Sequence, residues 1–221
     1  MDTNALIQQL ADNSKPMSPL SNPWVRTAIW LAISMPYVFL VVLLMSPRED
    51  LLEKLASSRF MIEQSAALAT SLTAAVAAFV STIPGYNRKY LLLPTLPVLA
   101  WLGTLGVGCM LDFSHHGNQG TTFHADWFCL PGIVFVGAVP GLVIALMLKR
   151  GAPLTPTLST ALAGLAAAGL GDFGLRLFHP EDAGLVVLVW QFGTVFGLSL
   201  LAGWAGRHIL NWHAMHKTLA T

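Results

Sequence analysis

The apolar residues of this chain gather in six runs, each near the roughly 20 residues that cross a bilayer as a helix. The runs lie at about residues 24–45, 62–83, 91–111, 128–148, 158–178 and 185–206. A backbone surrounded by lipid must satisfy its own hydrogen bonds, as a helix does. We therefore predict an all-α polytopic membrane protein, in which a bundle of six transmembrane helices at 23–206 lies between an N-terminal segment at 1–22 and a tail at 207–221.

The N-terminal segment has the pattern of a short amphipathic helix. Asp2 and Thr3 can cap it, and Leu6, Ile7 and Leu10 then share one face. A free helix of this length is marginal in water. We expect the segment either to stay a disordered tail or to fold onto a partner that covers these three side chains.

A second short helix is expected between the first two runs. Ser46 and Glu49 have the spacing of a capping box, and Pro47 suits a first helical position. The pattern predicts an amphipathic interfacial helix whose leucines, among them Leu51, Leu52 and Leu55, face lipid or protein.

Charge is scarce in this chain. Charged residues make up 10% of it and the mean hydropathy is +0.62, whereas a soluble domain carries about 25% charged residues. The net charge is +1 and the basic residues form no cluster, so we expect no nucleic-acid binding, which needs a concentrated Lys/Arg surface.

The twelve Lys and Arg residues predict the orientation. If the N-terminus is cytoplasmic, four of them lie outside: Arg48, Lys54, Arg59 and Arg176. The other eight lie inside: Lys15, Arg26, Arg88, Lys89, Lys149, Arg150, Arg207 and Lys217. The positive-inside rule therefore places both termini in the cytoplasm. The cytoplasmic turns at Arg88 and Arg150 are then a second candidate surface for a cytoplasmic partner, besides the N-terminal helix.

The stretch between the third and fourth runs is the most polar interruption of the apolar pattern. Cys109 and Cys129 flank it, it contains His115, His116 and His124, and it has no Lys or Arg. In the predicted topology this outer cap and the turn that carries His179 face the same side of the membrane. Thiolate and imidazole ligands together suit soft ions such as zinc or copper, although the spacing matches no closed zinc motif.

Two other interpretations of the cap stay open. Cys109 and Cys129 lie near the outer ends of consecutive antiparallel spans, so they are candidates for a disulfide in an oxidising compartment. The plainer interpretation is a loop with ordinary histidines and two small apolar cysteines at helix ends.

Asp172 is the one acid well inside a span. An ionisable residue in a membrane is a candidate functional site, and Asp172 ends a Gly-x-Gly-Asp string like that of intramembrane aspartyl proteases. That chemistry needs a second carboxylate at the same depth, and Glu63 is expected at the start of its own span. Arg176 follows at i+4, so we predict a structural Asp172–Arg176 pair. The chain also lacks nucleotide-binding, zinc-hydrolase and serine-hydrolase motifs, and we predict that it is not an enzyme.

Small residues recur at every fourth position in three runs, which favours close helix packing. Gly137 and Gly141 do so in the fourth run, Gly193 and Gly197 in the sixth, and a longer series in the fifth: Ser159, Ala163, Ala167 and Gly171. We expect these faces to make contacts within the bundle, with a homodimer as the alternative use.

Taken with Cys109, Cys129, Pro140 and Trp190, the Lys149-Arg150-Gly-Ala-Pro-Leu turn gives the chain a likeness to a known family. It resembles bacterial inner-membrane proteins of the NrsF type, which are negative regulators of extracytoplasmic-function sigma factors. The likeness covers nearly the whole chain and lies in the order and spacing of these motifs. It implies an anti-sigma factor that holds its sigma factor at the inner membrane and releases it under envelope, metal or oxidative stress.

The chain departs from this family at one position. A cysteine often stands in the family's turn before the last span, where it acts with the one that matches Cys129, whereas this turn reads Phe-His179-Pro-Glu-Asp. Two alternatives to sensing by a pair of thiols follow. Cysteine and histidine together could bind a soft metal ion as the stimulus, or the chain could have lost sensing. The rival hypothesis comes from another functional class: the chain is a small transporter or a metal-binding membrane protein. We expect no resident cofactor.

Overall fold

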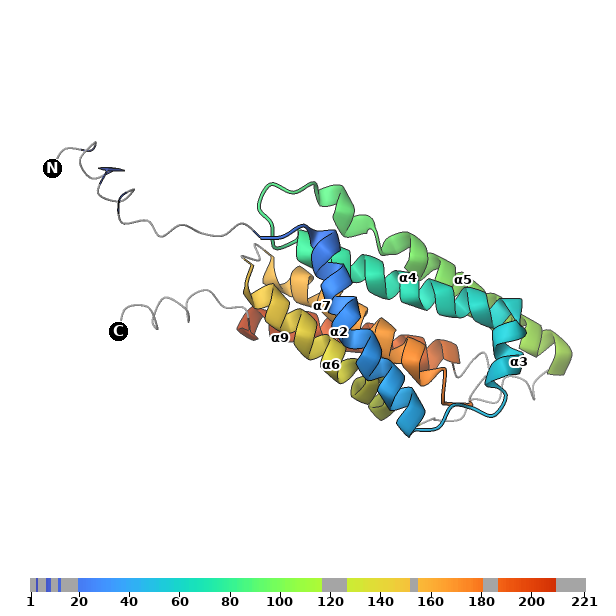
Figure 1. The fold of residues 1–221 in the computed structure, drawn as a ribbon. Helices are drawn as coiled ribbons and strands as arrows, with labels where there is room; N and C mark the ends of the chain where they lie inside the picture. Colours follow the sequence, from blue (N-terminus) through green and yellow to red (C-terminus); the bar gives the residue numbers. More distant parts are fainter. Residues whose placement is uncertain are drawn as a thin grey trace.

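The computed structural model describes residues 20–116, 127–151, 155–180 and 187–209, with isolated helical positions at Thr3, Ile7, Gln8 and Asp12. All regular structure in these ranges is helical (Figure 1). Six helical segments are long and apolar enough to cross a membrane. Their bounds are Pro23–Leu44, Ser58–Val80, Arg88–Leu111, Cys129–Lys149, Pro156–Leu175 and Val187–Gly206, which confirms the six predicted spans.

The helices are numbered as in Figure 1. The long ones are α2 (Pro23–Leu44), α4 (Ser58–Val80), α5 (Thr95–His116), α6 (Cys129–Lys149), α7 (Pro156–Leu175) and α9 (Gly193–Ile209). The short ones are α3 (Leu51–Ala56), the 3-10 helix η1 (Arg88–Leu92) before α5, and the π-helix η3 (Val187–Phe192) before α9.

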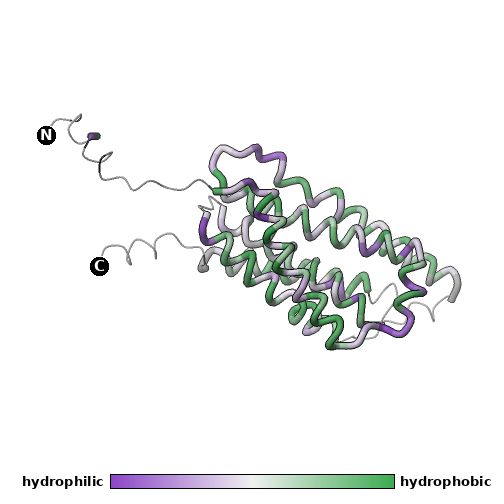
Figure 2. Tube along the Cα trace, in the orientation of Figure 1, coloured by the Kyte–Doolittle hydropathy of each residue, from purple (hydrophilic) through white to green (hydrophobic). Residues whose placement is uncertain are grey.

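The bundle has two ends, which we name after the limits of α2. At the Pro23 end, α2 and α7 begin, while α4, α6 and α9 end (Figure 1). At the Leu44 end, α2 and α7 end, α3 lies across the helix ends, and α6 begins. Figure 2 shows hydrophilic stretches mainly around the turns at the two ends and predominantly apolar helices between them. This distribution is typical of a protein whose middle lies in lipid.

Helix α7 is the centre of the bundle and contacts α2, α4, α6 and α9. Its contact with α6 depends on small residues, as predicted. A Cβ at Gly171 would lie 2.5 Å from the carbonyl oxygen of Ile133, and one at Gly137 would lie 3.0 Å from that of Ala167. The two backbones therefore touch directly, with no layer of side chains between them.

The expectation that the sixth run uses these small residues for contacts within the bundle is wrong. Among the residues that the structure describes, nothing lies within 4 Å of a Cβ added at Gly193 or Gly197. The contact between α7 and α9 instead uses Gly164, whose added Cβ would lie 2.6 Å from the Cβ of Ala202. The spacing of small residues was informative, but the rotation of α9 about its axis, which sequence does not give, decides which glycines face a neighbour.

The predicted capping box also does not form. Ser46 has a positive φ of 62°, and α3 begins only at Leu51, after Asp50. The reason is Arg48, whose side chain turns inward and forms an ion pair with Asp50, with Nε 2.6 Å from Oδ1. The helix thus begins later than predicted. Of its leucines, Leu52 and Leu55 are 83% and 42% exposed, whereas Leu51 is half-buried.

Candidate functional site

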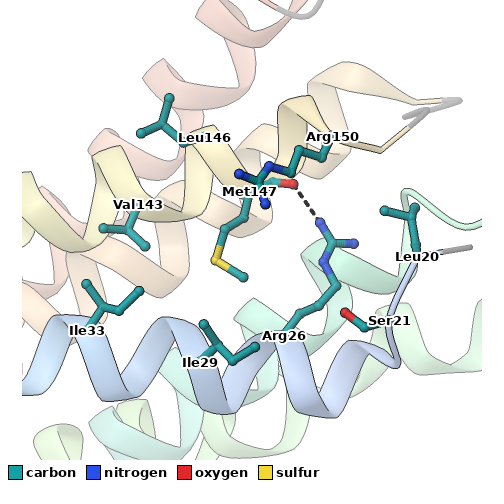
Figure 3. A pocket seen from close by; sticks show the side chains of 9 residues that line it. All are labelled: Leu20, Ser21, Arg26, Ile29, Ile33, Val143, Leu146, Met147 and Arg150. Atoms are coloured by element: carbon teal, nitrogen blue, oxygen red, sulfur yellow. Dashed lines mark hydrogen bonds between the residues drawn. The ribbon is translucent and has the colours of Figure 1, made fainter. Parts of the chain in front are cut away.

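A groove lies between α2 and α6 at the Pro23 end. It has a volume of about 810 Å³. Figure 3 shows its lining: Leu20, Ser21, Arg26, Ile29, Ile33, Val143, Leu146, Met147 and Arg150. The walls are mostly aliphatic and two arginines stand at one end, so the groove can accept an apolar surface that carries a negative charge.

Arg26 is held rigidly at this groove. Its Nη2 donates to the carbonyl oxygen of Met147 at 2.6 Å, as drawn in Figure 3, and its Nη1 donates to Oγ1 of Thr82 at 3.1 Å. Its guanidinium also lies 4.3 Å from the ring centroid of Phe79. A cation that binds a carbonyl in the last turn of α6 is favoured by the helix dipole. Arg26 therefore joins α2, α4 and α6 at this end.

Arg150 follows the last turn of α6 and is exposed. It lies near enough to Arg26 for the two positive charges to interact. Two like charges at one end of a groove create a positive potential that favours an acidic partner.

The other predicted partner-binding residues lie at the same end or outside the described ranges. Arg88 is exposed at the start of η1 and borders a separate depression of about 310 Å³. Ile7 is 59% exposed, whereas Leu6 and Leu10 lie outside the described residues. The groove could not be predicted from the sequence, because two helices distant in sequence form it. One signal was available: Arg26 stands at the start of one predicted span and Arg150 at the end of another.

At the Leu44 end, Cys129 is fully buried at the first turn of α6. Its Sγ accepts a hydrogen bond from Nε2 of Gln191 in η3 at 3.9 Å. Cys109, on α5, is partly exposed, and the two cysteines are not joined to each other. The structure therefore does not contain the disulfide that the sequence left open.

His179 lies at the same end of the bundle, in the turn after α7. Its ring is 5.4 Å from that of Phe128, the residue before Cys129, and its carbonyl oxygen accepts from Nη1 of Arg48 at 3.5 Å. Arg48 also donates its backbone N–H to the carbonyl oxygen of Leu177 at 3.2 Å. Arg48 thus fastens the turn after α2 to the turn after α7.

The predicted metal-binding set is only partly placed. His115 and His116 end α5, but their side chains, like the whole of His124, fall outside the described residues. Within the described ranges, no three His, Cys, Asp or Glu side chains are positioned to hold a metal ion. The metal-sensing set therefore stays a prediction.

Near the Leu44 end, where α4 begins and α7 ends, lies a buried group of charged side chains. Nη2 of Arg176 donates to Oε2 of Glu63 at 3.1 Å, and Nε of Arg59 donates to Oε1 of Glu63 at 3.0 Å. Asp172 lies one turn before Arg176 on α7 and interacts electrostatically with both Arg176 and Glu63. Glu63 is therefore at the same depth as Asp172, contrary to the expectation from sequence, because the start of α4 meets the end of α7.

This arrangement does not suit a protease. Glu63 and Asp172 line a common cavity, but its volume is about 10 Å³ and Arg176 lines it with them. Such a cavity holds about one water molecule, so a peptide has no room there.

Comparisons with known proteins identify relatives of this chain. The sequence model of the NrsF family, described as negative regulator of sigma F, matches residues 10–212. The chain is 35% identical over 85 residues to the anti-sigma-F factor NrsF of Caulobacter vibrioides. That alignment spans 38% of this chain and 39% of the relative. No solved structure matches.

Proposed function

The chain belongs to the NrsF family of negative regulators of sigma F, and on that premise we propose that it is a membrane-bound anti-sigma factor. Its partner would be a sigma factor of the extracytoplasmic-function type, held at the bacterial inner membrane. The observation that carries this proposal is the extent of the family match, since residues 10–212 include all six spans and part of the N-terminal segment. A role as a regulator, and not as an enzyme, follows from the same membership.

The Pro23 end is the proposed docking side. The positive-inside rule favours this end as cytoplasmic, because the exposed Arg88 and Arg150 both lie there. Leu20 and Ser21, which connect the N-terminal segment to α2, line the groove. The N-terminal segment therefore enters the bundle beside an apolar groove with two arginines, and the segment and the groove together offer a sigma factor an apolar and positively charged surface. Helix-in-groove contacts of this kind are a common mode of protein recognition.

The Leu44 end is the proposed sensing side. The Cys129 thiol is buried against Gln191, so a soft metal ion or an oxidant can reach the sulfur only if α6 and η3 separate there. A stimulus of this kind changes the conformation only by binding one arrangement better than the other. We propose that modification of Cys129, with His179 nearby as a second ligand for a metal ion, favours an arrangement in which the Pro23 end releases the sigma factor.

Capture of the full-length protein in mild detergent tests the proposal. A sigma factor from the same bacterium should co-purify with the protein and should elute when the Pro23 end is altered. Two results would contradict the proposal. One is that no sigma factor co-purifies with the protein, and the other is that variants altered at the Pro23 end retain the sigma factor fully.

A further inference from the structure

The charges of the bundle are divided unequally between its two ends. Within the ranges 20–116, 127–151, 155–180 and 187–209, the acids all lie toward the Leu44 end: Glu49, Asp50, Glu53, Glu63, Asp112 and Asp172. At the Pro23 end, Arg26 and Arg150 line the groove between α2 and α6. These ranges therefore contain no acid that could balance the charges of the two arginines.

Arg26 is the arginine that most needs a negative charge, because it is only 4% exposed. Among the described residues, its guanidinium donates to two neutral acceptors, the carbonyl oxygen of Met147 and Oγ1 of Thr82. A guanidinium has five N–H donors, so these bonds leave part of it unused. A buried charge is costly unless an opposite charge pairs with it. An anion at this end of the groove would supply that charge and further acceptors.

The rest of the groove is apolar. Four of its side chains, which we call the aliphatic wall, lie between the arginines and the middle of the bundle: Ile29, Ile33, Val143 and Leu146. On each helix they stand three or four and seven residues from the arginine, and so on the same helix face. Figure 3 shows both arginines at one end of the groove, and Ile33 and Val143 at the other. Seven residues of helix extend this wall about 10 Å beyond the arginines.

This arrangement fits the two parts of an anionic phospholipid. Arg26 is in the first turn of α2 and Arg150 follows the last turn of α6, which is the level of the lipid phosphates. The aliphatic wall lies deeper, within the candidate spans Pro23–Leu44 and Cys129–Lys149, at the level of the acyl chains. A segment of a soluble protein at that depth would have to satisfy its backbone polar groups without water, whereas an acyl chain has none.

We propose that this groove binds one anionic phospholipid, with its phosphate at Arg26 and Arg150 and the upper part of an acyl chain along the aliphatic wall. The planar guanidinium suits phosphate because it can donate two parallel hydrogen bonds, and basic pockets between transmembrane helices bind anionic lipid headgroups. The groove volume of about 810 Å³ is within the usual range of ligand pockets, about 300–1,000 Å³. The inference goes beyond the proposed anti-sigma function and does not depend on it, since the lipid needs no sigma factor to bind.

Thermal unfolding of the full-length protein in detergent tests this site, with phosphatidylglycerol or phosphatidylcholine of the same acyl chains added to the micelles. A ligand of the folded state raises the unfolding temperature, so phosphatidylglycerol should raise Tm by about 3–5 °C at ten times its apparent dissociation constant. Phosphatidylcholine, which has no net charge, should have a much smaller effect. Native mass spectrometry should show one phosphatidylglycerol per chain, preferred about tenfold over phosphatidylcholine.

Variants at one end of the bundle locate the site. Arg150 is exposed, so Arg150→Gln should fold, and it should reduce the preference for phosphatidylglycerol about fivefold. Arg88→Gln is the matched control, because Arg88 is also exposed at the Pro23 end but does not line this groove. It should keep the preference of the unaltered protein.

Three results would overturn the proposal. Equal binding of the two lipids, or an equal preference in Arg150→Gln and Arg88→Gln, would leave the two arginines to an acidic protein surface. Inorganic phosphate at the concentration of the lipid should leave Tm unchanged. Stabilisation by phosphate as large as that by phosphatidylglycerol would show a site for a small anion instead of a lipid.

Discussion

Arg176, the residue that caps the C-terminus of α7, and Glu63 on α4 form a buried ion pair across 113 positions of sequence, with Nη2 and Oε2 3.1 Å apart. Both side chains are less than 10% exposed. The pair joins the helix that forms the centre of the bundle to the helix that begins beside the Leu44 end. Charged side chains can be buried in this membrane domain because each acid at this depth, Glu63 or Asp172, has an arginine near it.

Removal of one partner of this pair should destabilise the bundle strongly. Glu63→Gln leaves Arg176 charged without its carboxylate, and breaking a buried pair in this way costs about 3–5 kcal/mol. The double variant Glu63→Gln with Arg176→Met should recover much of that loss. Thermal unfolding in detergent, followed by circular dichroism, measures both. A double variant as unstable as the single one would show that the pair itself is not the source of the effect.

Charge reversal at the groove should weaken partner binding without unfolding the protein. Arg150 is exposed, so Arg150→Glu should change Tm little, but it should reduce sigma-factor retention, and the reduction should shrink as salt screens the charges. Lys54→Glu makes the same change at the Leu44 end and is the control. Equal losses from both variants would indicate a nonspecific effect of charge.

The N-terminal helix can be tested by placing charge on its apolar face. The double change Leu6→Asp and Leu10→Asp would bring carboxylates into an apolar contact and should release the sigma factor, because an unpaired charge is costly to bury. Leu52→Asp, at a residue 83% exposed at the opposite end, is the matched control and should retain the partner. If the double variant also retains it, the turns at Arg88 and Arg150 hold the sigma factor instead.

Sensing should depend on Cys129. We expect Cys129→Ser to abolish release by both soft metal ions and thiol reagents, because the sulfur at the α6–η3 contact is then absent. His179→Ala should abolish release by metal ions alone. Co-purification of the sigma factor before and after each treatment is the measurement, with Cys109→Ser as the control for the second thiol. Unchanged responses in Cys129→Ser would place the sensor elsewhere in the chain.

The orientation can be measured with reporter fusions. Fusions after Arg88 and Arg150 should report the cytoplasm, and fusions within residues 117–120 should report the periplasm, as the distribution of basic residues predicts. A periplasmic signal after Arg150 would invert the proposed docking and sensing sides.

The six spans could be predicted from the sequence because bilayer thickness fixes the length of an apolar run, whatever the helices contact. The contacts between helices could not. Glu63 was expected at a different depth from Asp172, because a sequence does not show how far α4 is displaced along α7. Likewise, the contact of Cys129 with Gln191 and that of Arg26 with Met147 depend on how each helix is rotated about its own axis.

The same limit applies to the small residues. Gly171 and Gly193 each belong to a series of small residues spaced four apart. Of these two glycines, Gly171 lies against another backbone and Gly193 does not, among the described residues. A pattern of small residues shows that a face is able to pack closely, whereas the positions of the other helices decide whether it does.

The close packing of α7 has a mechanical consequence. Where two backbones touch directly, there are no long side chains whose rotamers can change to absorb a displacement, and a packed interior transmits strain. A shift of α7 at the Leu44 end, whether from the thiol or from the ion pair, would therefore move its other end by nearly the same distance as a rigid rod. In the proposed orientation, the glycines that bring α7 against α6 and α9 would set how much of a change at the Leu44 end reaches the Pro23 end. Larger residues at these positions should therefore weaken that coupling as well as the stability of the fold.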